Sequence, residues 1–142
     1  MVRLTRSLIV VLGLSLCYHS AMAICLDGRH PTVNDEFGES AFVGVGVVTG
    51  HKEFSSPDDP EGVEKTLYDF KVSRRFKGGM RSAIRIQSDN TSSRFPMEVG
   101  KSYLVFLRTA DKELFVDACG NSGELRLRTA AIAQLKKRRP CK

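Results

Sequence analysis

The chain has 142 residues, with 22 lysines and arginines against 16 aspartates and glutamates, which gives a formal net charge of +6. Hydrophobic residues make up 42% of it and no repeats or low-complexity segments occur, so a disordered or fibrous protein is excluded. Much of the excess positive charge lies near the C-terminus. This distribution argues against a basic face spread over the whole domain, and we expect no nucleic-acid partner.

Residues 1–23 have the three parts of a secretory signal peptide. Arg3 and Arg6 precede a short apolar run, and Ala21 and Ala23 supply small residues before a cleavage point. The run is far shorter than the roughly 20 residues that a membrane-spanning helix needs. We predict cleavage after Ala23 and export of one domain, residues 24–142, to the periplasm or the medium, with no transmembrane segment. Disulfides form in either compartment.

Residues 42–48 predict the first strand. Phe42 and the valines of this run favour a pleated surface, and Gly44 and Gly46 permit strong twist or a bulge. The spacing Gly44-x-Gly46-x-x-x-Gly50 differs by one residue from a dinucleotide-binding loop, and no helical pattern follows it. We therefore predict no cofactor. Residues 51–64, with two prolines and an acidic cluster, predict an exposed loop.

Residues 65–77 predict a second strand with one buried face, because apolar and polar side chains alternate with a period of two. The inward set is Thr66, Tyr68, Phe70 and Val72, and the outward set is Lys65, Asp69, Lys71 and Ser73. Gly78 and Gly79 end this strand. The alternation assigns the aromatic residues to the core.

Three further strands follow. Ile84 and Ile86 mark a short third strand, and residues 88–100 predict a polar loop. Residues 101–107 form a near-continuous apolar run that predicts a central strand, and residues 113–119 are expected to pair with it across the turn at 108–112. Five strands in about 80 residues predict a small barrel or sandwich.

The tail predicts a short helix. Thr129 is a candidate N-terminal cap, and Ile132 and Leu135, three residues apart, share one face. The cations of the last turn, Lys136, Lys137, Arg138 and Arg139, complement the negative end of the helix dipole. A solvated helix end accounts for these cations. Contact with a polyanion or an anionic envelope surface, through the tail 136–142, is the alternative function.

Five segments of the predicted mature chain form a pattern. They are Cys25, ESAFVGVGVVTG (39–50), Phe76-Lys77-Gly78, Gly100 with Tyr103-Leu104-Val105-Phe106, and Cys119-Gly120-Asn121. In this order and spacing they resemble the bacterial relatives of the tissue inhibitor of metalloproteinases, within the netrin-like module family. The resemblance implies a mainly all-β fold, a five-stranded OB-fold Greek-key barrel. It also implies that a flanking N-terminal segment is tied by a disulfide to the region near Cys119.

The resemblance further implies a non-enzymatic protein that binds a protein partner. The implied surface is the segment 24–28 beside the turn 117–123, with Ile24, Cys25, Leu26, Gly120 and Asn121 as partner-binding residues. In the animal inhibitors the first amine belongs to a cysteine and chelates the zinc of the target. Here Ile24 precedes Cys25, so the predicted α-amine lies one residue away from that position.

The residues also argue against catalysis and metal binding. The mature chain has three cysteines, Cys25, Cys119 and Cys141, and its two histidines fall in predicted loops. A cysteine nucleophile needs a base beside it, and no metal-ligand spacing occurs. Sequence alone leaves the connectivity open. The family pattern implies Cys25–Cys119, while Cys119–Cys141 and Cys25–Cys141 are the alternatives. Closing a loop of about 90 residues is worth roughly 4–5 kcal/mol, which favours a structural bridge.

Overall fold

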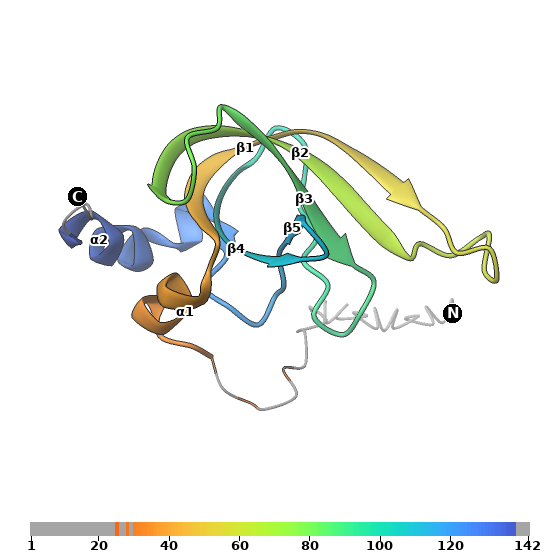
Figure 1. Ribbon diagram of the computed structural model, residues 1–142, viewed down its shortest axis with the longest axis horizontal. Helices are drawn as coiled ribbons and strands as arrows, with labels where there is room; N and C mark the ends of the chain where they lie inside the picture. Colours follow the sequence, from red (N-terminus) through yellow and green to blue (C-terminus); the bar gives the residue numbers. More distant parts are fainter. Residues whose placement is uncertain (1–24, 26–27, 29, 139–142) are drawn as a thin grey trace, which may run out of the picture.

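The computed structural model describes residue 25, residue 28 and residues 30–138 (Figure 1). The predicted signal peptide and its cleavage point lie outside the described residues. The same holds for four residues named above: Ile24, Leu26, Arg139 and Cys141. Among the residues that are described, no helix has the length and apolar character needed to cross a membrane.

The core of the molecule is a sheet that closes on itself. Its strands are β1 (Phe42–Phe54), β2 (Lys65–Lys77), β3 (Ala83–Asp89), β4 (Ser102–Ala110), β5 (Glu113–Phe115) and β6 (Gly123–Glu124). They form the ring β1-β2-β3-β5-β4, which closes because β4 also pairs with β1, and β6 adds to β4. Only the β3–β5 pair is parallel. This is an OB-like barrel, as the fold prediction required.

The barrel interior is filled by side chains that alternate along its strands. Of the predicted inward set in β2, Thr66, Tyr68 and Phe70 are buried and Val72 is half-buried. The interior cluster is Phe42, Val48, Tyr68, Phe70, Ile84, Ile86, Phe95, Met97, Tyr103, Val105, Leu107 and Val116. Because Tyr68 and Phe70 are buried, neither ring can stack on nucleic-acid bases.

The prediction of a polar loop at residues 88–100 was wrong for Phe95 and Met97, which belong to the interior cluster. Two buried tyrosines hold the loop there. The Tyr68 hydroxyl accepts the Met97 N–H at 3.2 Å, and the Tyr103 hydroxyl accepts the Glu98 N–H at 2.9 Å. The loop therefore closes one end of the barrel, and its backbone supplies the polar partners that buried tyrosines need.

A second apolar layer lies outside the barrel, where α1 (Val33–Glu39) and α2 (Thr129–Lys137) pack on β1 and β4. Its buried members are Val33, Val43, Val45, Leu104, Phe106, Ala131 and Leu135. Leu135 is buried in this layer and Ile132 is half-buried against it, so the prediction that the two share one helix face is confirmed. Helix α1 was not predicted, although Thr32 supplies a cap: its hydroxyl accepts the Asp35 N–H at 3.2 Å and donates to the Asp35 carboxylate at 2.6 Å.

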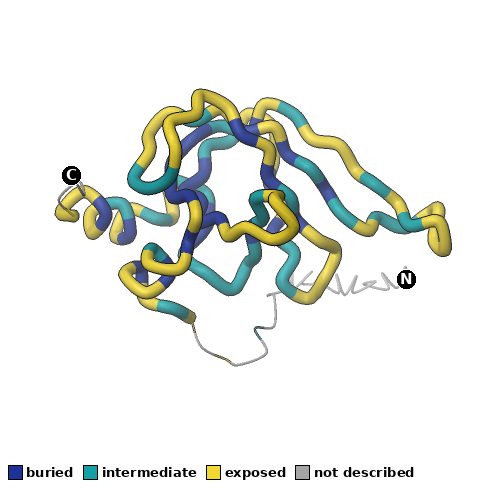
Figure 2. The backbone as a smooth tube through the Cα atoms, in the orientation of Figure 1, coloured by how far each residue is buried: buried dark blue, intermediate teal, exposed yellow. Residues whose placement is uncertain are grey.

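Several predicted boundaries differ from the structure. Strand β4 continues to Ala110, so most of the turn predicted at 108–112 is strand, and β3 continues to Asp89. Strand β1 continues to Phe54, so residues 51–54, predicted as loop, form a long hairpin with β2 whose outer end is mostly exposed (Figure 2). Strand β5 ends at Phe115 rather than at 119, because Asp117 turns the chain by accepting the Cys119 N–H. Thr129 does not cap α2; the preceding Arg128 occupies that position, directly after the 3-10 turn Leu125–Leu127.

Candidate functional site

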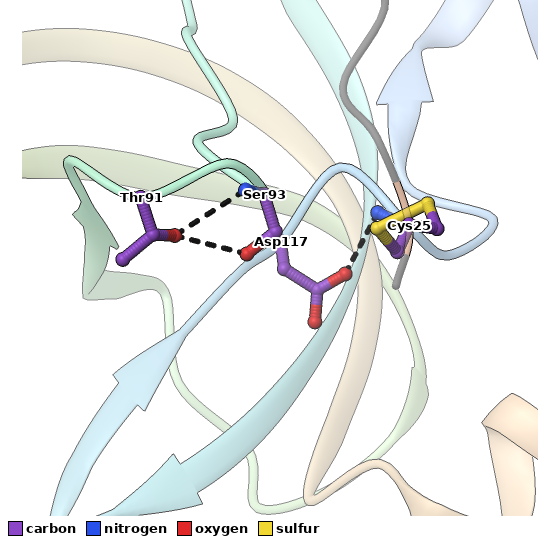
Figure 3. The surroundings of a disulfide bond; sticks show 5 residues. Cys25, Thr91, Ser93 and Asp117 are labelled. Atoms are coloured by element: carbon purple, nitrogen blue, oxygen red, sulfur yellow. Dashed lines mark hydrogen bonds between the residues drawn. A yellow bond between two sulfur atoms is a disulfide. The ribbon is translucent and has the colours of Figure 1, made fainter. Parts of the chain in front are cut away.

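A disulfide joins Cys25 to Cys119, which are 94 positions apart in sequence and whose Cα atoms are 5.6 Å apart (Figure 3). The pairing implied by the family pattern is therefore confirmed. It excludes both alternatives that involve Cys141, since each needed one of these two sulfur atoms. It also fixes the start of the described chain against the segment that follows β5.

The turn around Cys119 is held from the side of the β3–β4 loop. The Asp117 carboxylate accepts the Cys119 N–H at 2.8 Å (Figure 3). The Ala118 N–H donates to the Ser93 carbonyl, also at 2.8 Å. Ser93 is in turn fixed by Thr91, whose hydroxyl accepts the Ser93 N–H at 3.3 Å. Asp117 therefore fixes the turn from within, and Ser93 fixes it from the β3–β4 loop.

Asn121 holds the same turn from the side of α1. Its backbone N–H and its side-chain amide donate to one oxygen of the Glu36 carboxylate, at 2.5 and 2.7 Å, and the amide also donates to the Pro31 carbonyl at 2.9 Å. Glu36 is only 5% exposed, so this carboxylate is a buried group. A Cβ on Gly120 would lie 2.7 Å from the Glu36 Cδ, so a larger residue there would displace the Glu36 carboxylate.

We call this unit the anchored edge: Cys25 and residues 117–121, joined by the disulfide and held by Glu36 and Ser93. Cys25, Gly120 and Asn121, three of the predicted partner-binding residues, are half-buried members of it. Ile24 and Leu26 lie outside the described residues. The amide of Asn121 is used within the protein, which gives this residue a structural role. The exposed positions beside the edge are Gly28 and His30.

Burial raises the pKa of the Glu36 carboxyl above its ordinary value of 4.5, and the negative charge of Asp117 adds to the increase, while the two Asn121 hydrogen bonds act in the opposite direction. A raised pKa in the folded state means that the fold favours the protonated carboxyl over the carboxylate. The stabilisation from this group is complete below the pKa of the unfolded chain and is lost as pH rises through the folded pKa.

We therefore expect Glu36→Gln to change the pH dependence of stability. The glutamine keeps a carbonyl that accepts the Asn121 N–H groups but removes the ionisation. As pH rises from about 4 to 8, the free energy of unfolding of the variant should increase relative to that of the wild type. Urea unfolding at several pH values measures this, with Glu61→Gln on the exposed hairpin loop as the control for loss of one charge. Parallel profiles for Glu36→Gln and the wild type would contradict the prediction.

The cations of the predicted basic tail differ in their contacts. Lys136 and Lys137 are exposed, and within residues 30–138 neither forms an ion pair. Arg138 instead contacts α1: it donates to the Asn34 side-chain oxygen, and its guanidinium carbon lies 4.1 Å from the centre of the Phe37 ring. Arg138 thus links the two helices, and Arg139 lies outside the described residues.

The described part of the chain offers little for metal or thiol chemistry. It contains no cluster of three or more histidine, cysteine, aspartate or glutamate side chains placed to hold a metal ion. Its two cysteines are both consumed by the disulfide. No protein-family model matches the chain, and no curated protein matches it either.

Proposed function

We propose that this chain is an exported, non-enzymatic binding protein of the metalloproteinase-inhibitor-like class that holds a protein partner at the anchored edge and the adjoining segment 24–30. The observation that carries the proposal is the disulfide, which fixes Cys25 against the Cys119 turn. The resemblance described above implies a binding surface made of residues 24–28 and the turn 117–123, which overlaps the surface proposed here. A disulfide also agrees with an oxidising compartment outside the cytoplasm.

The rigidity of the anchored edge supports a binding role. Covalent and hydrogen-bonded contacts reach the turn from the N-terminal segment, from Ser93 and from Glu36. A surface that is already ordered loses little conformational entropy when a partner binds, so more of the contact energy appears as affinity. Connecting segments on a rigid scaffold are also where binding residues concentrate in proteins. Gly28 and His30 are the exposed positions next to this scaffold.

The test is site-specific photo-cross-linking of the exported full-length protein in its own host. A photo-reactive residue at His30 should give one discrete adduct with a protein partner, and excess unlabelled protein should compete it away. The matched control carries the same residue at Asp58, an exposed position on the outer hairpin loop. Absence of a competable adduct at position 30, or an equal adduct from position 58, would refute the proposal.

A second unlabelled competitor tests whether the cross-linked adduct depends on the anchored edge. The double variant Cys25→Ala/Cys119→Ala lacks the covalent tie, so we expect it to compete much less well than the wild type. If it competes equally, the partner does not depend on the anchored edge and the assignment of the surface is wrong.

A further inference from the structure

A groove of about 610 Å³ lies on the outer side of the barrel, between the β1–β2 pair and α2, the helix drawn beside the curved ends of these strands in Figure 1. Its lining is Val45, Ser73, Arg74, Leu125, Thr129, Ile132, Ala133 and Lys136. None of these residues belongs to the anchored edge. The volume is within the range of small-molecule sites, about 300–1,000 Å³.

A β-bulge in β2 determines which of its side chains form one wall of the groove. Val47 pairs with Lys71 and Gly46 with Val72, but Val45 pairs with Arg74, so Ser73 is an extra residue in β2. Simple alternation from Phe70 and Val72 would turn Arg74 into the barrel. The bulge instead places Arg74 on the same outer face as its partner Val45, and the Ser73 hydroxyl donates to the Val45 carbonyl at 3.1 Å.

The opposite wall is one stripe of α2. Thr129, Ile132, Ala133 and Lys136 line the groove at helical spacing. The helix packs on the barrel through the neighbouring stripe, where Ala131 and Leu135 are buried. The groove-lining stripe is consequently left open by the fold, with Thr129 at the positive end of the helix dipole.

The lining combines an apolar surface with unbalanced positive charge. Four of the lining residues are aliphatic: Val45, Leu125, Ile132 and Ala133. Arg74 and Lys136 are exposed cations of the same groove, no carboxylate lines it, and in the described part of the chain neither cation has an ion-pair partner. An apolar ligand alone would leave this charge uncompensated, and a small inorganic anion would leave the aliphatic surface uncovered.

We propose that this groove binds a free single-chain amphiphilic carboxylate, a molecule of the fatty-acid type. Its hydrocarbon chain covers the aliphatic residues, and its carboxylate lies between Arg74 and Lys136. The planar guanidinium of Arg74 suits a carboxylate, which can accept two parallel N–H bonds from it. Ser73 and Thr129 line the same space.

The probe is laurate, titrated below its micelle-forming concentration into ¹⁵N-labelled full-length exported protein. We expect saturable shifts of the amides of Val45, Ser73, Ile132 and Ala133, with little change at Asn121. Calorimetry gives the affinities. Dodecanol, which lacks the charge, and acetate, which lacks the chain, should each bind at least about tenfold more weakly than laurate, because each makes only half of the contacts.

Matched variants localise the carboxylate and the chain. Arg74→Gln and Lys136→Gln should each weaken laurate binding on the order of tenfold, the effect of losing one charge-assisted hydrogen bond. Lys137→Gln, next in the same helix but outside the groove, should leave it unchanged. Ala133→Phe should block binding by filling the groove, whereas Ala130→Phe, at an exposed position of α2 that does not line the groove, should not.

Several results would overturn the proposal: no saturable shift, shifts centred away from the groove, equal affinity for dodecanol, or equal effects of Lys136→Gln and Lys137→Gln. Thermal unfolding of each variant verifies that it is folded. Heparin binding separates this site from the alternative role of the tail, because a polyanion surface would respond equally to Lys136→Gln and Lys137→Gln. The cross-linking test at His30 involves none of the groove residues. The fatty-acid proposal can therefore fail while the proposed function holds, and the reverse.

Discussion

Replacing both Cys25 and Cys119 by alanine is expected to lower the free energy of unfolding by about 4–5 kcal/mol. The bridge closes a loop between residues 94 apart in sequence, and an unfolded chain without it regains the corresponding conformational entropy. A loss of this size is a large fraction of the 5–15 kcal/mol typical of a domain. Urea unfolding of the oxidised wild type and the double variant measures it.

The double variant is the appropriate comparison because each single variant leaves an unpaired thiol. We expect its barrel to stay folded, since the turn keeps its hydrogen bonds from Asp117, Ser93 and Glu36. The amide shifts of β1 to β4 should therefore be preserved while those of Gly28 and His30 change. A loss below about 1 kcal/mol, or an unfolded double variant in the absence of urea, would contradict this account of the bridge.

The barrel was predictable because each strand carries its own local evidence. In β2 the alternation of Thr66, Tyr68 and Phe70 with polar residues needs no knowledge of the rest of the chain. The apolar run that became β4 is buried from Tyr103 to Leu107, as its composition indicated. The OB-like topology came from the family resemblance, since pairing order depends on contacts between distant segments.

The hydrogen bonds that hold the anchored edge could be predicted only in part. Cys119 has Asp117 two residues before it and Asn121 two residues after it, so a fixed turn was a local inference. Its connection to Glu36 joins residues 85 apart in sequence, and no local pattern indicates such a contact. The one available clue was the Thr32–Asp35 capping pair, which predicts a helix that would carry Glu36 on the same face as Val33.

The groove could not be predicted from the sequence, because it depends on one extra residue in β2. Strict alternation assigns Arg74 to the interior, where an unpaired guanidinium would be strongly unfavourable. The glycines of β1 allowed for a bulge in this region, but they did not indicate which residue of β2 would be the extra one. The position of Ser73 is set by the pairing of Val45 with Arg74, a contact that only the folded sheet supplies.

Gly46→Ala is expected to destabilise the protein by about 3 kcal/mol or more, the upper range for overpacking a core. A Cβ at this position would overlap the Lys71 carbonyl oxygen of the paired strand and lie 2.9 Å from the Phe70 Cζ. Strand β1 pairs with β2 on one side and with β4 on the other, so it cannot move away from either. Urea unfolding measures the loss.

Gly50→Ala is the matched control in the same strand. Its added Cβ would meet only the Asp69 carboxylate, at 3.5 Å, an ordinary contact distance, so we expect a change within about 1 kcal/mol. Equal effects at the two positions would contradict the steric explanation. Adding Phe70→Leu to Gly46→Ala removes the ring but leaves the Lys71 carbonyl, so we expect no recovery of stability.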